Sequence, residues 1–286
     1  MITRKYILGS EWGYCKIYTG AKNADMLLVD IIYPLMSNLE EEELIDKWFY
    51  IRYVDSTFHI RLRFHLKDSN KLGNIIYRIY CKINTCIQNR SVSSLVYDTY
   101  SREVERYGEE NYDETETLFY YDSKYLLEII QATLKYPYDD SFRWRIALAM
   151  TNDLFDVIGM DLYERLLFSE RARNEFRREF GFMNKSTIEQ FNRKARKYRK
   201  LIESSVSKNG FTVEVNQLLD KRKIDISMLL APLRNIQARR NEYYIGSIIH
   251  MTINRLFISS NRLYEMMIYD FLYRYYKSLL NRKISQ

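Results

Sequence analysis

Residues 58–66, FHIRLRFHL, alternate apolar and basic side chains without interruption. Successive side chains on an extended strand point to opposite faces, with alternate residues roughly 6.8 Å apart at a rise of about 3.4 Å per residue. The basic members therefore share one face: His59, Arg61, Arg63 and His65. Because arginine presents paired donors to a carboxylate, a row of this spacing can hold an anion. The alternative is an ordinary strand with one solvated face.

A second candidate is the segment SREVERYGEE, residues 101–110. On a helical turn Glu103 and Arg106 are neighbours at i, i+3. Such a pair can be a carboxylate base held beside a guanidinium. It can equally be a surface ion pair that contributes about a few tenths of a kcal/mol. The spacing alone leaves both interpretations open.

The third candidate is His250, within YYIGSIIHMTINRLF, residues 243–257. On a helix it shares a face with Ser247 and Asn254, among isoleucines. Histidine is the side chain best suited to proton transfer near neutral pH. A histidine on an apolar helix is also often a structural core residue, so a catalytic role is one of two interpretations.

The segment 171–200 is strongly basic, with eleven Lys or Arg, three Glu and interleaved aromatic residues. Such a segment can attract RNA or an acidic peptide. It can also be the solvated face of two helices, and the sequence favours this simpler reading.

Composition limits the class of protein. The chain has 286 residues, a net charge of +7, and three cysteines without framework or metal-site spacing. Phosphate-loop, HExxH and GxSxG motifs are missing, which argues against nucleotide hydrolysis, zinc proteolysis and serine-esterase chemistry. No apolar run reaches the roughly 18 residues of a membrane span, and the N-terminus lacks a signal-peptide pattern. We expect a soluble cytoplasmic protein without a metal.

These candidates need a sheet and helices to position them. Strand-like runs at residues 12–18, 48–54 and 58–66 include a hairpin turn at Asp55-Ser56-Thr57, and residues 26–33 fit either a strand or a helix. A helix is expected over 70–88. Another is expected from an Asp122-Ser123 cap to a stop before Pro137, and two more over 241–281, with a break around 259–261. The chain is therefore predicted to be one α+β domain, residues 1–286, with its sheet mainly in the N-terminal third and a helical C-terminal half.

Taken in order, WGYCKIY, WFYIRYVDSTFHIRLRF, REVERYG, ETLFYYDS and SIIHMTINRL resemble one family. The chain is similar, from about Trp12 to about Tyr275, to the C-terminal elimination domain of lantibiotic dehydratases, which also occurs free-standing in thiopeptide biosynthesis. The resemblance implies a glutamate lyase. A Ser or Thr of a precursor peptide is first esterified with glutamate, and elimination then leaves dehydroalanine or dehydrobutyrine.

The resemblance also implies which residues act. The catalytic set would be Arg63, Glu103, Arg106 and His250. The two arginines would bind the glutamyl carboxylates and the developing oxyanion, and Glu103 and His250 would transfer protons in an order left open. Further substrate contacts are expected from Arg52, His59, Arg61 and Asn254. No metal or organic cofactor is called for, and the three segments are expected to converge on one pocket.

The partners implied are a precursor peptide with its leader and a separate glutamyl-tRNA-dependent glutamylation protein. A homodimer is compatible with this scheme, and direct tRNA binding is not expected. One alternative is a pyridine synthase of the same fold, which joins two dehydroalanines by a [4+2] cycloaddition. Another is a non-catalytic peptide- or RNA-binding partner that uses residues 171–200.

Overall fold

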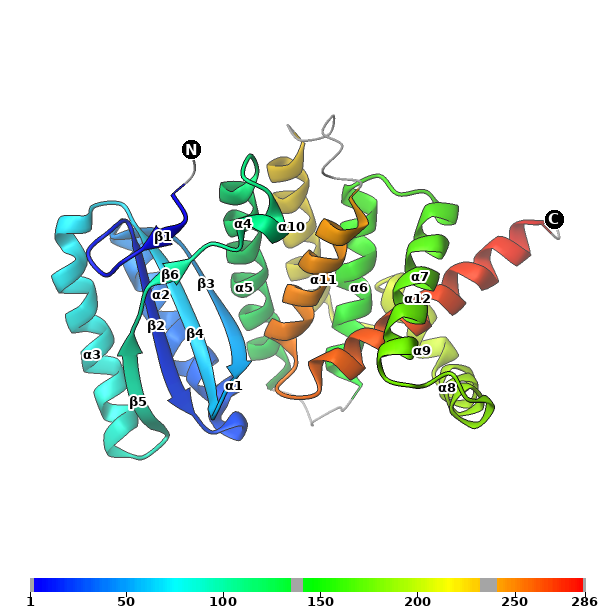
Figure 1. Ribbon diagram of the computed structural model, residues 1–286, viewed down its shortest axis with the longest axis horizontal. Coiled ribbons are helices and arrows are strands. Elements are labelled where there is room, and N and C mark those ends of the chain that lie inside the picture. The colour runs from blue at the N-terminus through cyan, green and yellow to red at the C-terminus, as the bar shows by residue number, and fades with distance from the viewer. Residues whose placement is uncertain (1–2, 135–140, 232–240, 285–286) are drawn as a thin grey trace. The chain divides into compact units, whose positions relative to one another are not determined.

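The computed structural model of the chain describes residues 3–134, 141–231 and 241–284 (Figure 1). The chain forms two compact units, Met1–Pro137 and Tyr138–Gln286. Unit 1 contains both sheets, and the described part of unit 2 is helical. The predicted α+β class, with the sheet in the N-terminal part, is confirmed.

Unit 1 is built on a four-stranded antiparallel sheet of order β3-β4-β2-β5, joined by a short β1-β6 ribbon. The strands are β1 (Lys5–Tyr6), β2 (Trp12–Thr19), β3 (Ile45–Val54), β4 (Phe58–Leu66), β5 (Val92–Tyr97) and β6 (Tyr100–Ser101). The expected hairpin joins β3 to β4, and the Asp55 carboxylate accepts hydrogen bonds from the amides of Ser56 and Thr57. The basic row thus lies on β4, an inner strand.

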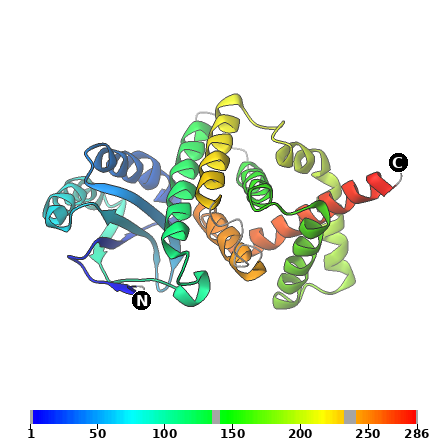
Figure 2. The ribbon, with the colours of Figure 1, turned by 90° about the horizontal axis from the view of Figure 1, so that it is seen from above.

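Two helices, α2 (Tyr33–Glu41) and α3 (Leu72–Gln88), cover one face of this sheet (Figure 2). On that face Gly13 lies opposite Phe64, and a Cβ atom at Gly13 would come within 2.2 Å of the Phe64 ring. Glycine is therefore required there for close packing. Helix α3 turns Ile75, Ile79 and Ile83 inward at helical spacing, as its sequence predicts.

Residues 26–33, which fit two structures in sequence, are helical. A short helix α1 (Ala24–Met26) is followed by a π-helical turn, Leu27–Ile32, that continues into α2. Leu28, Ile32, Met36 and Leu39 are all completely buried, and this spacing of three and four residues suits a helix.

The expectation for the next helix was wrong at its start. After the single turn α4 (Val104–Tyr107), helix α5 (Tyr112–Leu134) begins ten residues before Asp122. Ser123, expected at the helix cap, is instead fully buried, and its Oγ accepts a hydrogen bond from the Tyr50 amide at 3.2 Å. Helix α5 therefore packs along the open edge of β3. Pro137, where a stop was expected, lies outside the described residues.

Unit 2 is a bundle in which α12 packs lengthwise on α7 around buried aromatic side chains. Its helices are α6 (Phe142–Val157), α7 (Leu162–Glu179), α8 (Lys185–Lys197), α9 (Arg199–Val206), α10 (Val213–Leu230), α11 (Glu242–Leu256) and α12 (Asn261–Ile284). Helix α7 begins with a capping box between Asp161 and Glu164. The expected break near 259–261 is confirmed, with Ser260 in the left-handed region at a φ of 56°.

Candidate functional site

The basic row of β4 runs between two lines of mainly aromatic and apolar side chains, which also include Lys16 opposite Arg61 and Lys47 opposite His65. Directly opposite residues of antiparallel strands share a face. Arg63 pairs in register with Tyr14 of β2 and Phe49 of β3, while His59 pairs with Tyr18 and Tyr53. The row is therefore set in an aromatic surface on the face of the sheet opposite Phe64.

Arg63 is a buried cation, only 9% exposed. Its guanidinium carbon lies 4.7 Å from the centroid of the Tyr14 ring, 5.0 Å from that of Tyr100 and 5.3 Å from that of Phe49. Its buried Nε has no hydrogen-bond partner, and no carboxylate of the described residues forms an ion pair with it. Aromatic faces offset part of the cost of burying a charge. An anion that reached Arg63 would therefore meet an uncompensated guanidinium.

His59 supports Arg61. The His59 ring is fully buried, its Nδ1 lies 3.1 Å from the Thr57 carbonyl oxygen, and Arg61 Nε donates to its Nε2 at 3.2 Å. This arrangement places the histidine proton on Nδ1. Burial lowers the pKa of His59, and the nearby charge of Arg61 lowers it further. The Thr57 carbonyl and the Asp55 carboxylate raise this pKa, but by less than burial lowers it. A neutral His59 thus holds the Arg61 guanidinium, which lies 3.4 Å from the centroid of the Tyr53 ring.

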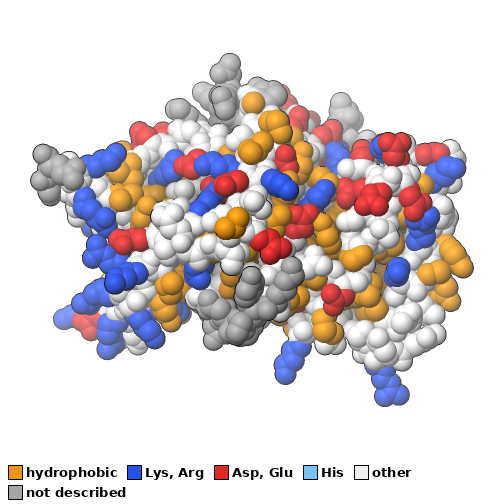
Figure 3. Space-filling model, turned by 180° about the vertical axis from the view of Figure 1, so that it is seen from behind, with side chains coloured by type: hydrophobic (Ala, Val, Ile, Leu, Met, Phe, Trp, Pro, Cys, Tyr) orange, Lys and Arg blue, Asp and Glu red, His pale blue; other side chains and the backbone are white. Residues whose placement is uncertain are grey.

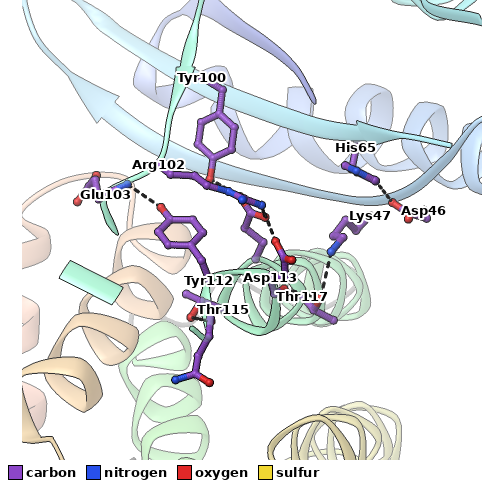
Figure 4. Close-up of polar contacts among 12 residues, drawn as sticks. Asp46, Lys47, His65, Tyr100, Arg102, Glu103, Tyr112, Asp113, Thr115 and Thr117 are labelled. Carbon is purple, nitrogen blue, oxygen red and sulfur yellow. Dashed lines mark hydrogen bonds and ion pairs between the residues drawn. The ribbon is translucent and has the colours of Figure 1, made fainter. Parts of the chain in front are cut away.

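Two other basic residues of the hairpin already have partners. His65 Nδ1 lies 2.7 Å from an Asp46 carboxylate oxygen (Figure 4). Arg52 pairs in register with Ile60, which puts it on the opposite face of the sheet. There it is 2% exposed and donates to Asp25 at 2.6 Å. This placement argues against the expected substrate contact of Arg52.

Residues 103–106, which we call the EVER segment, present an accessible carboxylate next to a guanidinium. Glu103 precedes α4, and its amide donates to the Tyr112 hydroxyl at 2.7 Å (Figure 4). Arg106 Nη1 lies 3.4 Å from the Glu103 carboxylate, whose side chain is 64% exposed. The expected i, i+3 pairing is confirmed, and its carboxylate remains open to a ligand.

Ring contacts connect this segment to Arg63. Tyr107 of α4 packs edge-on against Phe119 at 5.3 Å between ring centroids, Phe119 lies 5.5 Å from Phe49, and Phe49 lies beside Arg63. Within unit 1 the structure therefore places Arg63 and the EVER segment around one aromatic cluster.

A buried ion network that sequence reasoning missed fixes one wall of this cluster. The Glu116 carboxylate, fully buried, accepts from the Tyr100 hydroxyl at 2.6 Å and from Arg102 Nε at 2.9 Å, and Arg102 also pairs with Asp113 at 2.6 Å (Figure 4). Burial raises the pKa of Tyr100 well above its usual value, so the hydroxyl keeps its proton and donates. The network holds the Tyr100 ring over Arg63.

In unit 2, His250 of α11 is oriented by a carboxylate of α12. Its Nδ1 lies 2.8 Å from Glu265 Oε2, and Glu265 is only 3% exposed. A carboxylate on Nδ1 leaves Nε2 as the nitrogen that can exchange a proton, and within the described ranges Nε2 makes no other hydrogen bond. Asn254 follows one helical turn later and is half-buried. No sequence signal marked Glu265.

The candidate residues thus divide between the units. Arg63, Glu103 and Arg106 belong to unit 1, and His250 and Asn254 belong to unit 2. The convergence of all three segments on one pocket stays a prediction.

The described residues contain neither a metal-binding cluster nor a helix that could span a membrane. Within residues 3–134, 141–231 and 241–284, no group of three or more His, Cys, Asp or Glu side chains could hold a metal ion. The described helices include none that is both long and apolar enough to cross a bilayer.

Comparison with known proteins decides the family. The model of the "Lantibiotic biosynthesis dehydratase C-term" family matches residues 12–276. The chain belongs to this family. Its relatives include the nisin biosynthesis protein NisB of Lactococcus lactis subsp. lactis, which is 27% identical over 277 residues. That alignment covers 94% of this chain and 26% of NisB, so the chain spans about a quarter of the relative's length.

Two solved structures share the fold of this chain. The tRNA-dependent lantibiotic dehydratase MibB of Microbispora sp. 107891 matches with a TM-score of 0.77 and 21% identity, over 99% of this chain and 29% of MibB. The pyridine synthase TbtD from thiomuracin biosynthesis matches with a TM-score of 0.67 and 10% identity, over 94% of this chain and 98% of TbtD. At these identities the likeness concerns the fold alone.

Proposed function

We propose that this chain is a glutamate lyase, which eliminates glutamate from glutamylated Ser or Thr residues of a peptide and leaves dehydroalanine or dehydrobutyrine. Membership of the lantibiotic dehydratase C-terminal family supports a role in dehydration. The observation that carries the proposal is the state of Arg63, a buried guanidinium within an aromatic cage and without a carboxylate partner in the described structure. A substrate carboxylate would supply the missing partner.

The reaction needs charge stabilisation at two places. A base removes the Cα proton of the esterified residue, the electron pair forms the Cα–Cβ double bond, and the Cβ–O bond breaks to release glutamate as a carboxylate. Guanidinium groups would stabilise the enolate-like charge and the leaving carboxylate, since fixed charges in a site shielded from water act strongly. We assign this charge stabilisation to Arg63 and Arg106, and we expect Arg61 to be a further substrate contact.

Two groups can transfer protons. Glu103 is exposed and adjacent to Arg106, whereas His250 is held by Glu265 with Nε2 directed away from that bond. The His–Glu arrangement is the one that orients an imidazole for repeated proton transfer. We therefore propose His250 as a proton-transfer group, with Glu103 as its counterpart.

The glutamyl ester must come from a separate esterification reaction. The proposal accordingly includes a glutamyl-tRNA-dependent glutamylation protein and a precursor peptide with a leader as partners.

The test is a single-turnover assay on a synthetic peptide that carries one glutamylated serine. We expect free glutamate to appear together with a peptide one water lighter than its unmodified form.

The second candidate, pyridine synthesis, is suggested by the full-length fold match to TbtD. If glutamate is never released, and a peptide with two dehydroalanines is cyclised instead, the lyase proposal is wrong and pyridine synthesis replaces it.

A further inference from the structure

Unit 2 contains a pocket of about 850 Å³ whose wall is basic. It is lined from helices α7, α8, α9 and α12, and we call it the basic pocket. No carboxylate residue belongs to its described lining, whereas six cationic side chains do: Arg173, Arg177, Arg199, Arg274, Lys277 and Arg282. Lys and Arg side chains also gather at the left of Figure 3, around α8 and the end of α12.

The floor of the basic pocket holds more positive than negative charge. The Asp270 carboxylate, 1% exposed, lies 2.7 Å from Arg177, 2.7 Å from Arg274 and 4.0 Å from Arg173. Burial lowers the pKa of Arg177, and its two arginine neighbours lower it further while Asp270 opposes them. One buried carboxylate therefore serves three guanidinium groups, with Glu170 reaching only Arg173, at 3.7 Å.

At the mouth of the basic pocket, too, positive charges outnumber the carboxylates that pair with them. Arg199 and Arg282 share one carboxylate, that of Glu203, at 3.3 and 2.7 Å. Lys277 donates to the Tyr273 hydroxyl at 3.0 Å, which is a neutral partner. Across the basic pocket the six cations thus meet three carboxylates, and the surplus charge favours a ligand with several negative groups.

The cations are spread along a line rather than around a point. Between Arg274 and Arg282 helix α12 rises about 12 Å, at about 1.5 Å per residue. Carboxylates on alternate residues of an extended peptide are spaced by roughly 6.8 Å, so two or three of them would match this length. A second pocket of about 440 Å³ shares Arg199 and Arg274 with the first and is lined by the buried Ile202 and Phe271.

These features favour a peptide over a nucleic acid. Single-stranded nucleic acids need aromatic faces for base stacking. Tyr273 is the one aromatic residue of the basic pocket's described lining, and Arg173 already covers its ring at 3.7 Å. The second pocket adds the completely buried Phe271 and the half-buried Tyr275, which together do not present the row of open rings that successive bases need. We propose that the basic pocket binds an acidic peptide segment, with its carboxylates on the arginines and an apolar side chain in the second pocket. This proposal uses none of the residues assigned to the elimination chemistry and does not depend on it.

The test is fluorescence anisotropy with the full chain and a labelled synthetic peptide of alternating Glu and Leu. The pocket variant is Lys277→Gln/Arg282→Gln, which avoids the buried Asp270 network. The matched control is Arg193→Gln/Lys283→Gln, which removes the same charge from α8 and α12 outside either pocket. We expect the dissociation constant to rise about tenfold or more in the pocket variant, or about 1.4 kcal/mol, and to change little in the control.

A second probe with Gln in place of Glu should bind at least about tenfold more weakly. Three outcomes would overturn the proposal: equal losses in the two double variants, equal binding of the Glu and Gln probes, or preferential binding of single-stranded RNA. Glutamate release from a short neutral glutamylated peptide should be unchanged in the pocket variant, so failure of the lyase proposal would be recognised separately.

Discussion

The Nδ1 atom of His250 lies 2.8 Å from the buried carboxylate of Glu265. The two residues belong to consecutive helices that meet at the break after Phe257. Under the proposed function Glu265 is a positioning residue, because a carboxylate on Nδ1 fixes both the tautomer and the ring orientation of the imidazole.

Glu265→Gln should therefore slow glutamate release by about tenfold to 10²-fold, as expected when an acid–base group is poorly oriented. The imidazole ¹⁵N shifts of His250 should report a changed tautomer, which a purely structural loss would not produce. Glu179→Gln is the matched control, since exposed Glu179 contacts the same Arg262. An unchanged rate in Glu265→Gln would remove the positioning role.

Arg63→Lys should reduce glutamate release by about 10²-fold or more, because lysine keeps the charge but lacks the planar fork and stacks less well on the aromatic cage. Quantified glutamate and circular dichroism would separate activity from folding. Arg78→Lys, at an exposed pair with Glu42, is the control and should retain full activity. Activity near that of the unaltered protein in Arg63→Lys would refute the role of this guanidinium.

His59 predicts a pH dependence of stability. Because its pKa is lowered from 6.5 in the folded chain, the unfolded chain takes up a proton first as the pH falls. The free energy of unfolding should therefore be highest above pH 6.5, decrease as the pH falls through 6.5, and level off below the folded pKa. Urea denaturation at about pH 8 and about pH 5 measures this change. If the free energy of unfolding of His59→Gln depends on pH in the same way, the dependence comes from groups other than His59.

Gly13→Ala should lower the free energy of unfolding by about 1–3 kcal/mol, because the new methyl group would overlap the Phe64 ring. Phe64→Leu in the same chain should recover part of the loss, which a double-mutant cycle detects. Gly73→Ala, with open space around the added Cβ, should be neutral or stabilising. Equal effects at the two glycines would contradict the close approach.

Alternation along residues 58–66 was sufficient to predict the β4 row, because a strand has a fixed period of two. The face occupied by Arg52 depends on strand register, which sequence does not contain. The start of α5 was missed because Asp122-Ser123 has the composition of a helix cap, whereas Ser123 lies inside α5 and accepts a hydrogen bond from the Tyr50 amide of another element. The His250–Glu265 pair could not be predicted, because it depends on how α11 and α12 pack on either side of the break between them. Local pattern thus predicted the elements, and non-local pairing determined the surroundings of the candidate groups.

The hydrogen bond from the Tyr50 amide to Ser123 has a consequence for self-association. An open sheet edge is a template on which a further strand, including one from another copy of the chain, can add. Helix α5 packs along this edge at β3, and its Ser123 hydroxyl accepts a hydrogen bond from the Tyr50 amide. Ser123→Ala removes this hydrogen bond and should weaken the packing of α5 on the sheet edge. Strand exchange between molecules should then become easier and appear as slow aggregation in concentrated solutions.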